Sequence, residues 1–451
     1  MVRPRLSLNM IHNDSPYQSE FEDSALFSSG RSSPGSAVSE SGLRDIHTHP
    51  LIKFTNTTLC ENGEFIPDSE LWVDTDSGKI VDAPSSNSTA QYVTVDLEGM
   101  FLTPGFIDAQ LNGAYGFDFS DHQYGNGSPE AYKQALATIS RQLLCTGCTS
   151  FCPTLPSTYP HVYKKVLPQL RASRSSYGAD NLGYHLEGPF LSPRKPGIHP
   201  KDSFVTAPDG IKSFNEIYGE ENLKHAKMIT VAVEQEGILE TVPELTKLGL
   251  TVSLGHSVAD YKTACEAVRN GASMITHIYN AMTQPHHRET SLFGLLGSPA
   301  SDLAQRPYFG IITDGLHVHP SAVSVAYHAN PQGCCIVTDA FFPMGLPSGT
   351  YSWGKQTIVK KDLELHLNDS NTIAGSAITM DASIRHLMKW ADIDLAQALK
   401  TATTNPAKAI GVYGQKGTLV PGADADLCVV DPKGHVKQVF KLGIRVYKSR
   451  S

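Results

Sequence analysis

Three residues with metal-binding side chains each follow a short apolar run of the chain. Glu187 ends one run, and His256 and His277 end two later runs. One carboxylate and two imidazoles form a standard ligand set for a catalytic zinc ion that keeps a fourth position for water. A metal so placed lowers the pKa of the water and polarises a carbonyl group. The three residues predict a site for a divalent metal, with zinc as the expected ion.

A fourth residue, Asp339, ends the last of these runs, in the stretch VTDA. A carboxylate there can act as general base toward the water and as general acid toward a leaving nitrogen. Each of the four residues also has an ordinary alternative, because a single His at a strand end is often structural and a Glu before Gly-Pro can cap a turn. Their occurrence at four run ends favours metal-assisted hydrolysis.

The four residues lie at the ends of four of eight short apolar runs in the chain. Several of the eight runs are followed by helix-like stretches. Near-continuous apolar strands are typical of parallel sheets with both faces buried. The pattern predicts an α/β fold, a (β/α)8 barrel of the TIM type, in which reactive groups lie at the C-terminal strand ends. The runs are FLTPGFIDAQLN, TSFCPTL, LGYHLEGPF, MITVAVE, LTVSLGHS, SMITHIYN, YFGIITDG and CCIVTDA.

Both chain ends differ in residue composition and pattern from the segment predicted to form the barrel, residues 101–410. Residues 1–46 are rich in Ser, Gly and Pro without a sustained apolar period, which predicts a disordered extension. Short β-rich runs separated by turn residues fill 47–100 and return in 411–451. These two segments predict one small β-sandwich domain built from both ends of the chain.

Composition bears on the partners and the compartment. The formal net charge of −8 argues against nucleic acid and against an anionic membrane surface. The chain has neither an 18-residue apolar run nor an apolar signal core, and its eight cysteines fit reduced thiols in the cytoplasm. Cys145-x-x-Cys148 could indicate a zinc or redox pair, but neither a second pair nor a thioredoxin-like context accompanies it. Ordinary buried cysteines are expected.

Nine stretches, in order over about residues 51–445, resemble the N-acetylglucosamine-6-phosphate deacetylases of the amidohydrolase superfamily. HLEGPF, LGHS, THxxNAM and VTDA are together specific to that family, whereas PGFID is common to the superfamily. The resemblance implies hydrolysis of the acetamide of N-acetyl-D-glucosamine 6-phosphate to D-glucosamine 6-phosphate and acetate, in amino-sugar catabolism. The stretches are PGFIDAQLNG, TGCTSFCPTL, HLEGPFLSPRKPGIHP, VSLGHSVADY, ITHIYNAMTQPHHRE, DGLHVHP, VTDAFFPMG, IAGSAITMD and KGTLVPGADADL.

The resemblance also implies roles for single residues. It makes Glu187, His256 and His277 the metal ligands and Asp339 the catalytic proton-transferring carboxylate. His199 is implied to bind and polarise the acetamide carbonyl. Some phosphate contacts of the family cross a subunit interface, so a homodimer is implied. The further substrate-binding residues implied are Asn280, Ala281, Arg288, His317, Ile373, Ala374 and Gly375.

The residue types at the predicted phosphate-binding positions allow two interpretations when the resemblance is set aside. HHRE at 286–289 and HVH at 317–319 concentrate cationic groups in an acidic protein, and Arg288 could bind phosphate through two parallel hydrogen bonds. The alternative is a solvated loop in which Arg288 pairs with Glu289 or a neighbouring acid. The residues leave both open.

Two His-x-His positions bear on the number of metals. Many amidohydrolases place this pair after PGFID, where this chain has Gln110 and Asn112. An amide is a poor zinc ligand beside imidazole, so one metal per chain is expected. The pair His47 and His49 in RDIHTHP precedes the predicted β-sandwich, and a flexible segment fixes ligand geometry poorly. Glu187 stands where many relatives have Lys, which disfavours dihydroorotase or hydantoinase chemistry.

Two other functions fit part of the pattern. An inactive amidohydrolase-like scaffold could bind a partner, yet the chain has lost neither a ligand nor Asp339. An enzyme that hydrolyses an unphosphorylated amide would not depend on Arg288 and His317. Dependence of the rate on the 6-phosphate therefore separates the deacetylase from that alternative.

Overall fold

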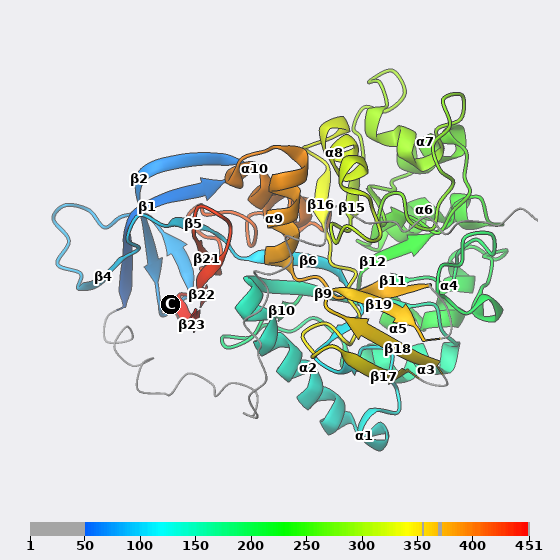
Figure 1. Ribbon diagram of the computed structural model, residues 1–451, viewed down its shortest axis with the longest axis horizontal. Coiled ribbons are helices and arrows are strands. Elements are labelled where there is room, and N and C mark those ends of the chain that lie inside the picture. Colours follow the sequence, from blue (N-terminus) through cyan, green and yellow to red (C-terminus); the bar gives the residue numbers. More distant parts are fainter. Residues whose placement is uncertain (1–49, 354–355, 369–371, 450–451) are drawn as a thin grey trace, which may run out of the picture.

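The structure is a computed structural model that describes residues 50–353, 356–368 and 372–449. A barrel lies beside a separate sheet in which strands from both ends of the chain meet (Figure 1). The expected disordered extension and the pair His47 and His49 lie outside the described residues. No helix in the described ranges is long and apolar enough to cross a membrane.

Eight parallel strands form the predicted barrel, and each of the eight apolar runs contributes one of them. The ring closes where the Asp339 amide donates to the Gln110 carbonyl (2.9 Å) and the Asn112 amide donates to the Ala340 carbonyl (2.8 Å). A short strand, β10 (Asp180–Asn181), pairs with β9 outside the ring. The barrel strands are β6 (Phe106–Leu111), β9 (Cys148–Pro156), β11 (Tyr184–Glu187), β12 (Ala226–Val231), β13 (Thr251–Leu254), β14 (Met274–Ile275), β15 (Tyr308–Ile311) and β16 (Cys334–Ile336).

Amphipathic helices cover the barrel, and α2 (Pro129–Leu143) shows how the sequence produces them. Ser128 accepts a hydrogen bond from the Ala131 amide, and a proline follows it at the first helical position. Tyr132, Leu136 and the other apolar residues at helical spacing are buried. The remaining α-helices of the described residues are α1 (Tyr124–Gly127), α3 (Pro160–Val166), α4 (Ile211–Tyr218), α5 (Glu220–Leu223), α6 (Ile238–Lys247), α7 (Tyr261–Arg269), α8 (Pro320–Ala329), α9 (Met380–Ala391), α10 (Leu395–Lys400) and α11 (Thr404–Ala409).

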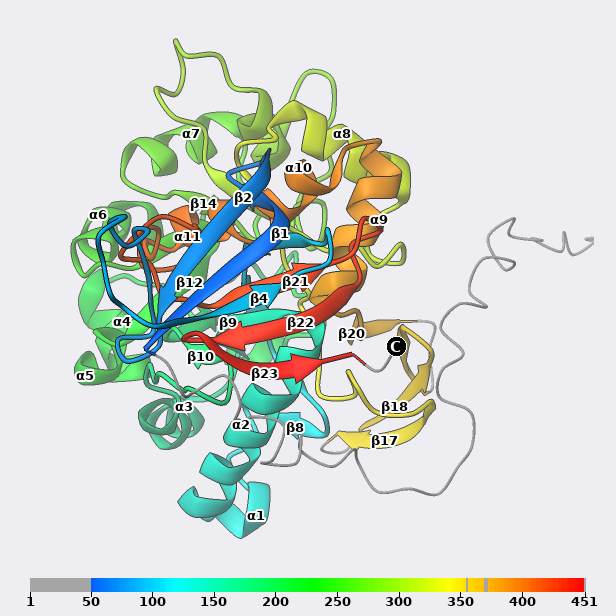
Figure 2. The ribbon, with the colours of Figure 1, turned by 90° about the vertical axis from the view of Figure 1, so that its left-hand side faces the viewer.

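The predicted β-domain from both chain ends is an eight-stranded sheet with the order β23-β22-β21-β5-β1-β2-β3, to which β4 adds beside β1. Its red C-terminal and blue N-terminal strands lie side by side in Figure 2. A buried apolar cluster that includes Ile52, Leu102 and Phe440 holds it together. The strands are β1 (Leu51–Glu61), β2 (Glu64–Asp74), β3 (Lys79–Val81), β4 (Tyr92–Asp96), β5 (Phe101–Pro104), β21 (Leu427–Val430), β22 (Val436–Lys441) and β23 (Ile444–Lys448).

The run FLTPGFIDAQLN, predicted as one strand, is divided between the two sheets. Strand β5 pairs with β1 and β21, and β6 enters the barrel beside β9. Gly105 joins them where a Cβ atom would lie 2.2 Å from the Thr149 hydroxyl oxygen, so a larger residue does not fit. An apolar strand has the same sequence pattern in either sheet, so the pattern could not predict that this run is divided between two sheets.

A four-stranded antiparallel sheet interrupts the chain between β16 and α9 and was not predicted. It comprises β17 (Gly349–Trp353), β18 (Gln356–Lys361), β19 (Glu364–Leu367) and β20 (Ile373–Ser376). The Trp353 indole donates to Asp118 (3.0 Å), which ties this sheet to β8 (Phe117–Asp118), a short strand that pairs with β7 (Gly113–Ala114) after β6. Ser376 pairs with Ala340, so β20 lies beside the C-terminal end of β16.

Candidate metal centre and active site

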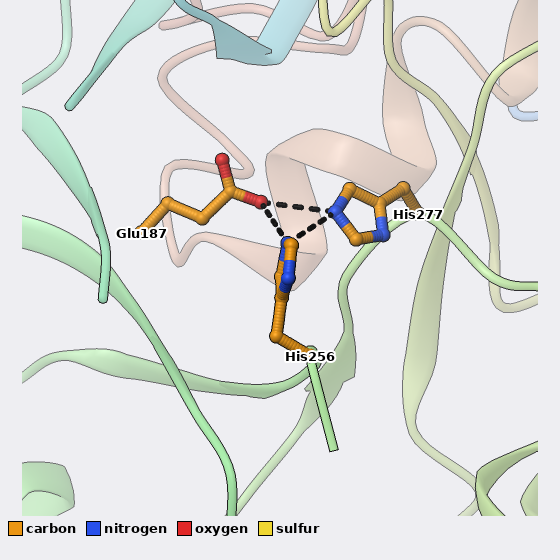
Figure 3. Close-up of side chains that lie close together, drawn as sticks. All are labelled: Glu187, His256 and His277. Carbon is orange, nitrogen blue, oxygen red and sulfur yellow. Dashed lines mark hydrogen bonds and ion pairs between the residues drawn. The ribbon is translucent and has the colours of Figure 1, made fainter. Parts of the chain in front are cut away.

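The three predicted ligands meet at the C-terminal ends of β11, β13 and β14 (Figure 3). Glu187 Oε1 lies 3.0 Å from His277 Nε2 and 3.3 Å from His256 Nε2, and the two imidazole nitrogens are 3.1 Å apart. All three side chains are buried. Tetrahedral zinc with bonds of about 2.0–2.1 Å spaces its ligand atoms roughly 3.3 Å apart. The triangle fits one divalent ion.

The orientation of the ligands also suits a metal. The His256 ring places Nδ1 2.8 Å from the Lys195 carbonyl, so Nδ1 carries the proton and Nε2 keeps its lone pair for the site. Burial favours a neutral Glu187, but the adjacent imidazoles of His256 and His277 outweigh burial and hold the pKa of that carboxyl well below its usual range. The site therefore offers one charged carboxylate and two imidazoles.

Backbone strain marks the same strand ends. His256, His277 and Asp339 have φ angles of 48°, 26° and 45°, in the left-handed region that non-glycine residues rarely adopt. Such conformations persist when the surrounding structure enforces them, and they concentrate at functional sites. The strained backbone therefore lies just after β13, β14 and β16, in the segments that carry the two imidazole ligands and Asp339.

Asp339 is buried beside the ligands and is held by the two amides that stand in the His-x-His positions. Its Oδ1 accepts from Asn112 Nδ2 (2.6 Å) and Gln110 Nε2 (3.1 Å). Gln110 Nε2 also donates to Glu187 Oε1 (3.0 Å). Burial and the charge of Glu187 raise the pKa of Asp339 to about 7, which suits a group that exchanges a proton near neutral pH.

His199 lies against the metal centre, with its ring centroid 4.5 Å from that of His256. The Ser157 amide donates to His199 Nδ1 (3.1 Å), so Nδ1 is an acceptor and a neutral ring carries its proton on Nε2. Burial and the nearby His256 lower the pKa of His199 to about 3, so the ring is neutral at physiological pH. His199 can therefore donate one hydrogen bond from Nε2.

Several other predicted substrate residues lie on elements that adjoin this centre. His317 Nδ1 pairs with Asp314 Oδ2 (2.6 Å), and although burial opposes it, this pairing raises the pKa of His317. Asn280 and Ala281 follow β14 in a strained turn, where Ala281 has a φ of 49°. Residues 373–375 form most of β20, beside the strand end that carries Asp339.

Arg288 is not brought into the centre by its own chain. It lies exposed in a short hairpin where His286 pairs with Glu289. Glu289 accepts hydrogen bonds from the Tyr261 and Ser291 amides. Within the described ranges no carboxylate lies in ion-pair distance of the Arg288 guanidinium, so the expected alternative pairing with Glu289 is not formed.

Two positioning groups were missed by the sequence pattern. The Ser157 amide determines which ring nitrogen of His199 carries the proton, and the Lys195 carbonyl does the same for His256. Ser157 directly follows β9, so the rule that selected the other strand ends applies to it as well. The backbone carbonyl of Lys195 has no signature in the sequence.

Two further groups that could suggest metal binding have other roles. Asp180, Asp424 and Asp426 form a buried cluster between β10 of the barrel side and the segment before β21. The ammonium group of Lys416 lies among them. Cys145 and Cys148 are free thiols that donate to the carbonyls of Gln142 and Ser150 respectively. Cys148 is buried as expected, but Cys145 is exposed, so the expectation of a buried residue was wrong there.

Comparison with known proteins agrees with this geometry. The model of the amidohydrolase family matches residues 101–446. An N-acetylglucosamine-6-phosphate deacetylase of Caenorhabditis elegans is 41% identical over 406 residues, which cover 89% of this chain and 95% of that protein. The chain belongs to the N-acetylglucosamine-6-phosphate deacetylase family of amidohydrolases.

Solved structures of N-acetylglucosamine-6-phosphate deacetylases share the fold. The protein of Pasteurella multocida is 28% identical with a TM-score of 0.75, and the match covers 88% of this chain and 100% of that one. A mutant of the Mycobacterium smegmatis deacetylase, solved in complex with N-acetyl-D-glucosamine-6-phosphate, is 25% identical with a TM-score of 0.73 and covers 89% and 100%. The resemblance predicted from the nine stretches is confirmed.

Proposed function

We propose that this protein hydrolyses the acetamide of N-acetyl-D-glucosamine 6-phosphate to D-glucosamine 6-phosphate and acetate. The observation that carries the proposal is the convergence of Glu187, His256 and His277 with Asp339 and His199 at one buried point, in a chain of this family. A three-ligand metal, a carboxyl of near-neutral pKa and a neutral hydrogen-bond donor are the groups that amide hydrolysis requires.

The residues divide the reaction between them. A metal held by Glu187, His256 and His277 supplies a Lewis acid and lowers the pKa of water. Asp339 takes the proton of the attacking water on Oδ2, since both amide donors occupy Oδ1. The Nε2–H of His199 stabilises the oxyanion that develops on the acetamide carbonyl. Asp339 then returns the proton to the departing nitrogen, which leaves as the amine.

One divalent metal per chain, with zinc as the expected ion, is part of the proposal. Gln110 and Asn112 fill the place of a second metal with amide groups that already donate to carboxylates. We expect chelation to abolish turnover and one equivalent of Zn²⁺ per chain to restore it, with acetate release and metal analysis as the measurements. Full activity of the metal-free protein, or a requirement for two equivalents, would contradict this part of the proposal.

Phosphate recognition is assigned to cationic and backbone groups. His317, with its raised pKa, and the turn at Asn280 and Ala281 lie beside the metal ligands. Arg288 is exposed and unpaired within the described ranges, which suits a group that acts on a second copy of the chain in a homodimer. Ile373, Ala374 and Gly375 contact the sugar from the other side. A cytoplasmic role in amino-sugar catabolism fits the eight free thiols.

Replacing Arg288 with alanine should lower kcat/KM for the phosphorylated sugar by about 10–100-fold, because a charge-assisted hydrogen bond contributes roughly 1.5–3 kcal/mol. The effect should fall mainly on KM, and the slow reaction of unphosphorylated N-acetylglucosamine should be unchanged. Arg141→Ala, an exposed arginine at the end of α2, serves as the control. Equal losses with both sugars would show that Arg288 does not recognise phosphate.

A further inference from the structure

Five polar side chains form a buried hydrogen-bonded row inside the barrel, directly below the metal ligands. We name the row the hydroxyl layer; four members lie in the adjacent strands β9, β11, β12 and β13, and the fifth directly follows β14. The members are Thr154, His185, Thr230, Ser253 and Thr276, all of them buried. Barrels are usually filled by layers of apolar branched side chains, so a polar layer there requires a reason.

Hydrogen bonds join the row from end to end. Thr154 Oγ1 lies 3.3 Å from His185 Nδ1, and His185 Nε2 lies 2.7 Å from Thr230 Oγ1. Thr230 Oγ1 lies 2.7 Å from Thr276 Oγ1, which lies 2.6 Å from Ser253 Oγ. Both ring nitrogens of His185 are therefore engaged, so the imidazole is a link in the row and is not free to bind a metal or a substrate.

The layer lies between the apolar floor of the barrel and the metal centre. Cys152 and Met228, two residues before Thr154 and Thr230 along their strands, belong to the apolar cluster of the floor. In the other direction, Glu187 follows His185 by two residues and therefore faces the same side of β11. The neighbour of Thr276 in the chain is the ligand His277. The row thus touches the strand segments that carry the ligands.

Thr230 has the central position, although its strand carries no metal ligand. Backbone ladders join β11 to β12, β12 to β13 and β13 to β14. The bond from Thr230 to Thr276 joins β12 to β14, which are not neighbours, and so spans the interior. A side chain at Gly255 would collide with both hydroxyl residues, at 2.7 Å from Thr276 Cβ and 2.9 Å from Thr230 Cγ2. The two threonines therefore support the backbone immediately before His256.

We propose that the hydroxyl layer is a positioning device for the metal centre, with Thr230 as its central positioning residue. By cross-linking five strands within the barrel, it fixes the relative heights and spacing of the strand ends that present Glu187, His256 and His277. It contributes no ligand and does not touch substrate. The proposal rests on the metal-dependent function argued above, because it concerns the affinity and geometry of that site.

Three variants test the role of Thr230. Thr230→Val keeps the shape but removes the hydroxyl, and Thr230→Ser keeps the hydroxyl. Thr404→Val removes a hydroxyl that is equally buried, in α11 at the opposite end of the barrel, where it donates to the Gly417 carbonyl (2.9 Å). This control matches the loss of a buried hydrogen bond without disturbing the layer. Full-length proteins are titrated with Zn²⁺ against a chelator and with Co²⁺ by visible absorption.

We expect Thr230→Val to weaken Zn²⁺ binding by about tenfold or more, the range seen when groups that orient metal ligands are lost. Its Co²⁺ spectrum should differ from that of the wild type. Thr230→Ser should restore wild-type affinity, and Thr404→Val should keep it even if its thermal midpoint falls as far as that of Thr230→Val.

Wild-type metal affinity and an unchanged Co²⁺ spectrum in Thr230→Val would overturn the proposal while leaving the proposed function intact. An equal loss of affinity in Thr230→Ser or in Thr404→Val would also overturn it, because the effect would then not depend on this hydroxyl. Failure of the wild type itself to bind a divalent metal would overturn both the positioning role and the proposed function.

Discussion

Replacing Asp339 with asparagine should leave the protein folded and metal-loaded but reduce kcat by about 10²–10⁴-fold, the usual contribution of a positioned acid or base. The amide oxygen can still accept from Asn112 and Gln110, as Oδ1 does now. The amide nitrogen then replaces Oδ2 and has no basic lone pair, so no group remains to take the proton of water. Rates of acetate release and metal content in the same preparation measure the effect.

A matched carboxylate-to-amide change provides the control. Asp394 is exposed and caps α10 by accepting from the Gln397 amide (2.8 Å). Asparagine caps a helix about as well as aspartate, so Asp394→Asn should retain full activity. Near wild-type turnover in a metal-loaded Asp339→Asn protein would remove Asp339 from the role of proton carrier.

Replacing Lys416 with methionine should be the most destabilising single change outside the site, by about 3–5 kcal/mol, as expected when one partner of a buried ion cluster is lost. Lys416 Nζ lies 2.5 Å from Asp180 and 2.9 Å from Asp424, and it also contacts Asp426. Burial opposes its charge, but these carboxylates outweigh burial and raise the pKa of Lys416. Without it, Asp180 and Asp426 would keep only Lys441, whereas Lys79 and Arg174 would still pair with Asp424.

This ion cluster joins the two main parts of the fold. Asp180 comes from β10 at the barrel, whereas Asp424 and Asp426 precede β21 of the end sheet. Denaturant midpoints of Lys416→Met and of Lys224→Met, an exposed lysine paired with Glu220 (3.0 Å), measure the effect. The exposed pair should contribute little because solvent screens it. Equal midpoints for both variants would show that the buried cluster does not hold the two parts together.

The barrel and the ligand positions could be predicted because two physical rules leave clear traces in a sequence. Strands buried on both faces are apolar throughout, and reactive groups of such barrels lie where the strands end. Glu187, His256 and His277 satisfy both rules and meet within hydrogen-bond distance. The role of Asp339 came from its position at a strand end and from the resemblance, whereas that of His199 came from the resemblance alone; substitution tests both.

Other features depend on contacts between residues that are distant in the chain. The bridge from Gln110 to both Glu187 and Asp339 joins three barrel strands, and the partners of Lys416 lie up to 236 positions away. Thr230 and His185 sit in apolar runs where they resemble tolerated core residues until their partners are known.

The most direct test of the proposed function compares acetate release from N-acetylglucosamine 6-phosphate and from N-acetylglucosamine, with metal content measured in the same sample. We expect kcat/KM to be about a hundredfold or more higher for the phosphorylated sugar, since charge-assisted contacts to phosphate contribute several kcal/mol in sum. We also expect about one divalent metal per chain. Equal rates with both sugars, or acetate release that persists without metal, would contradict the proposed function.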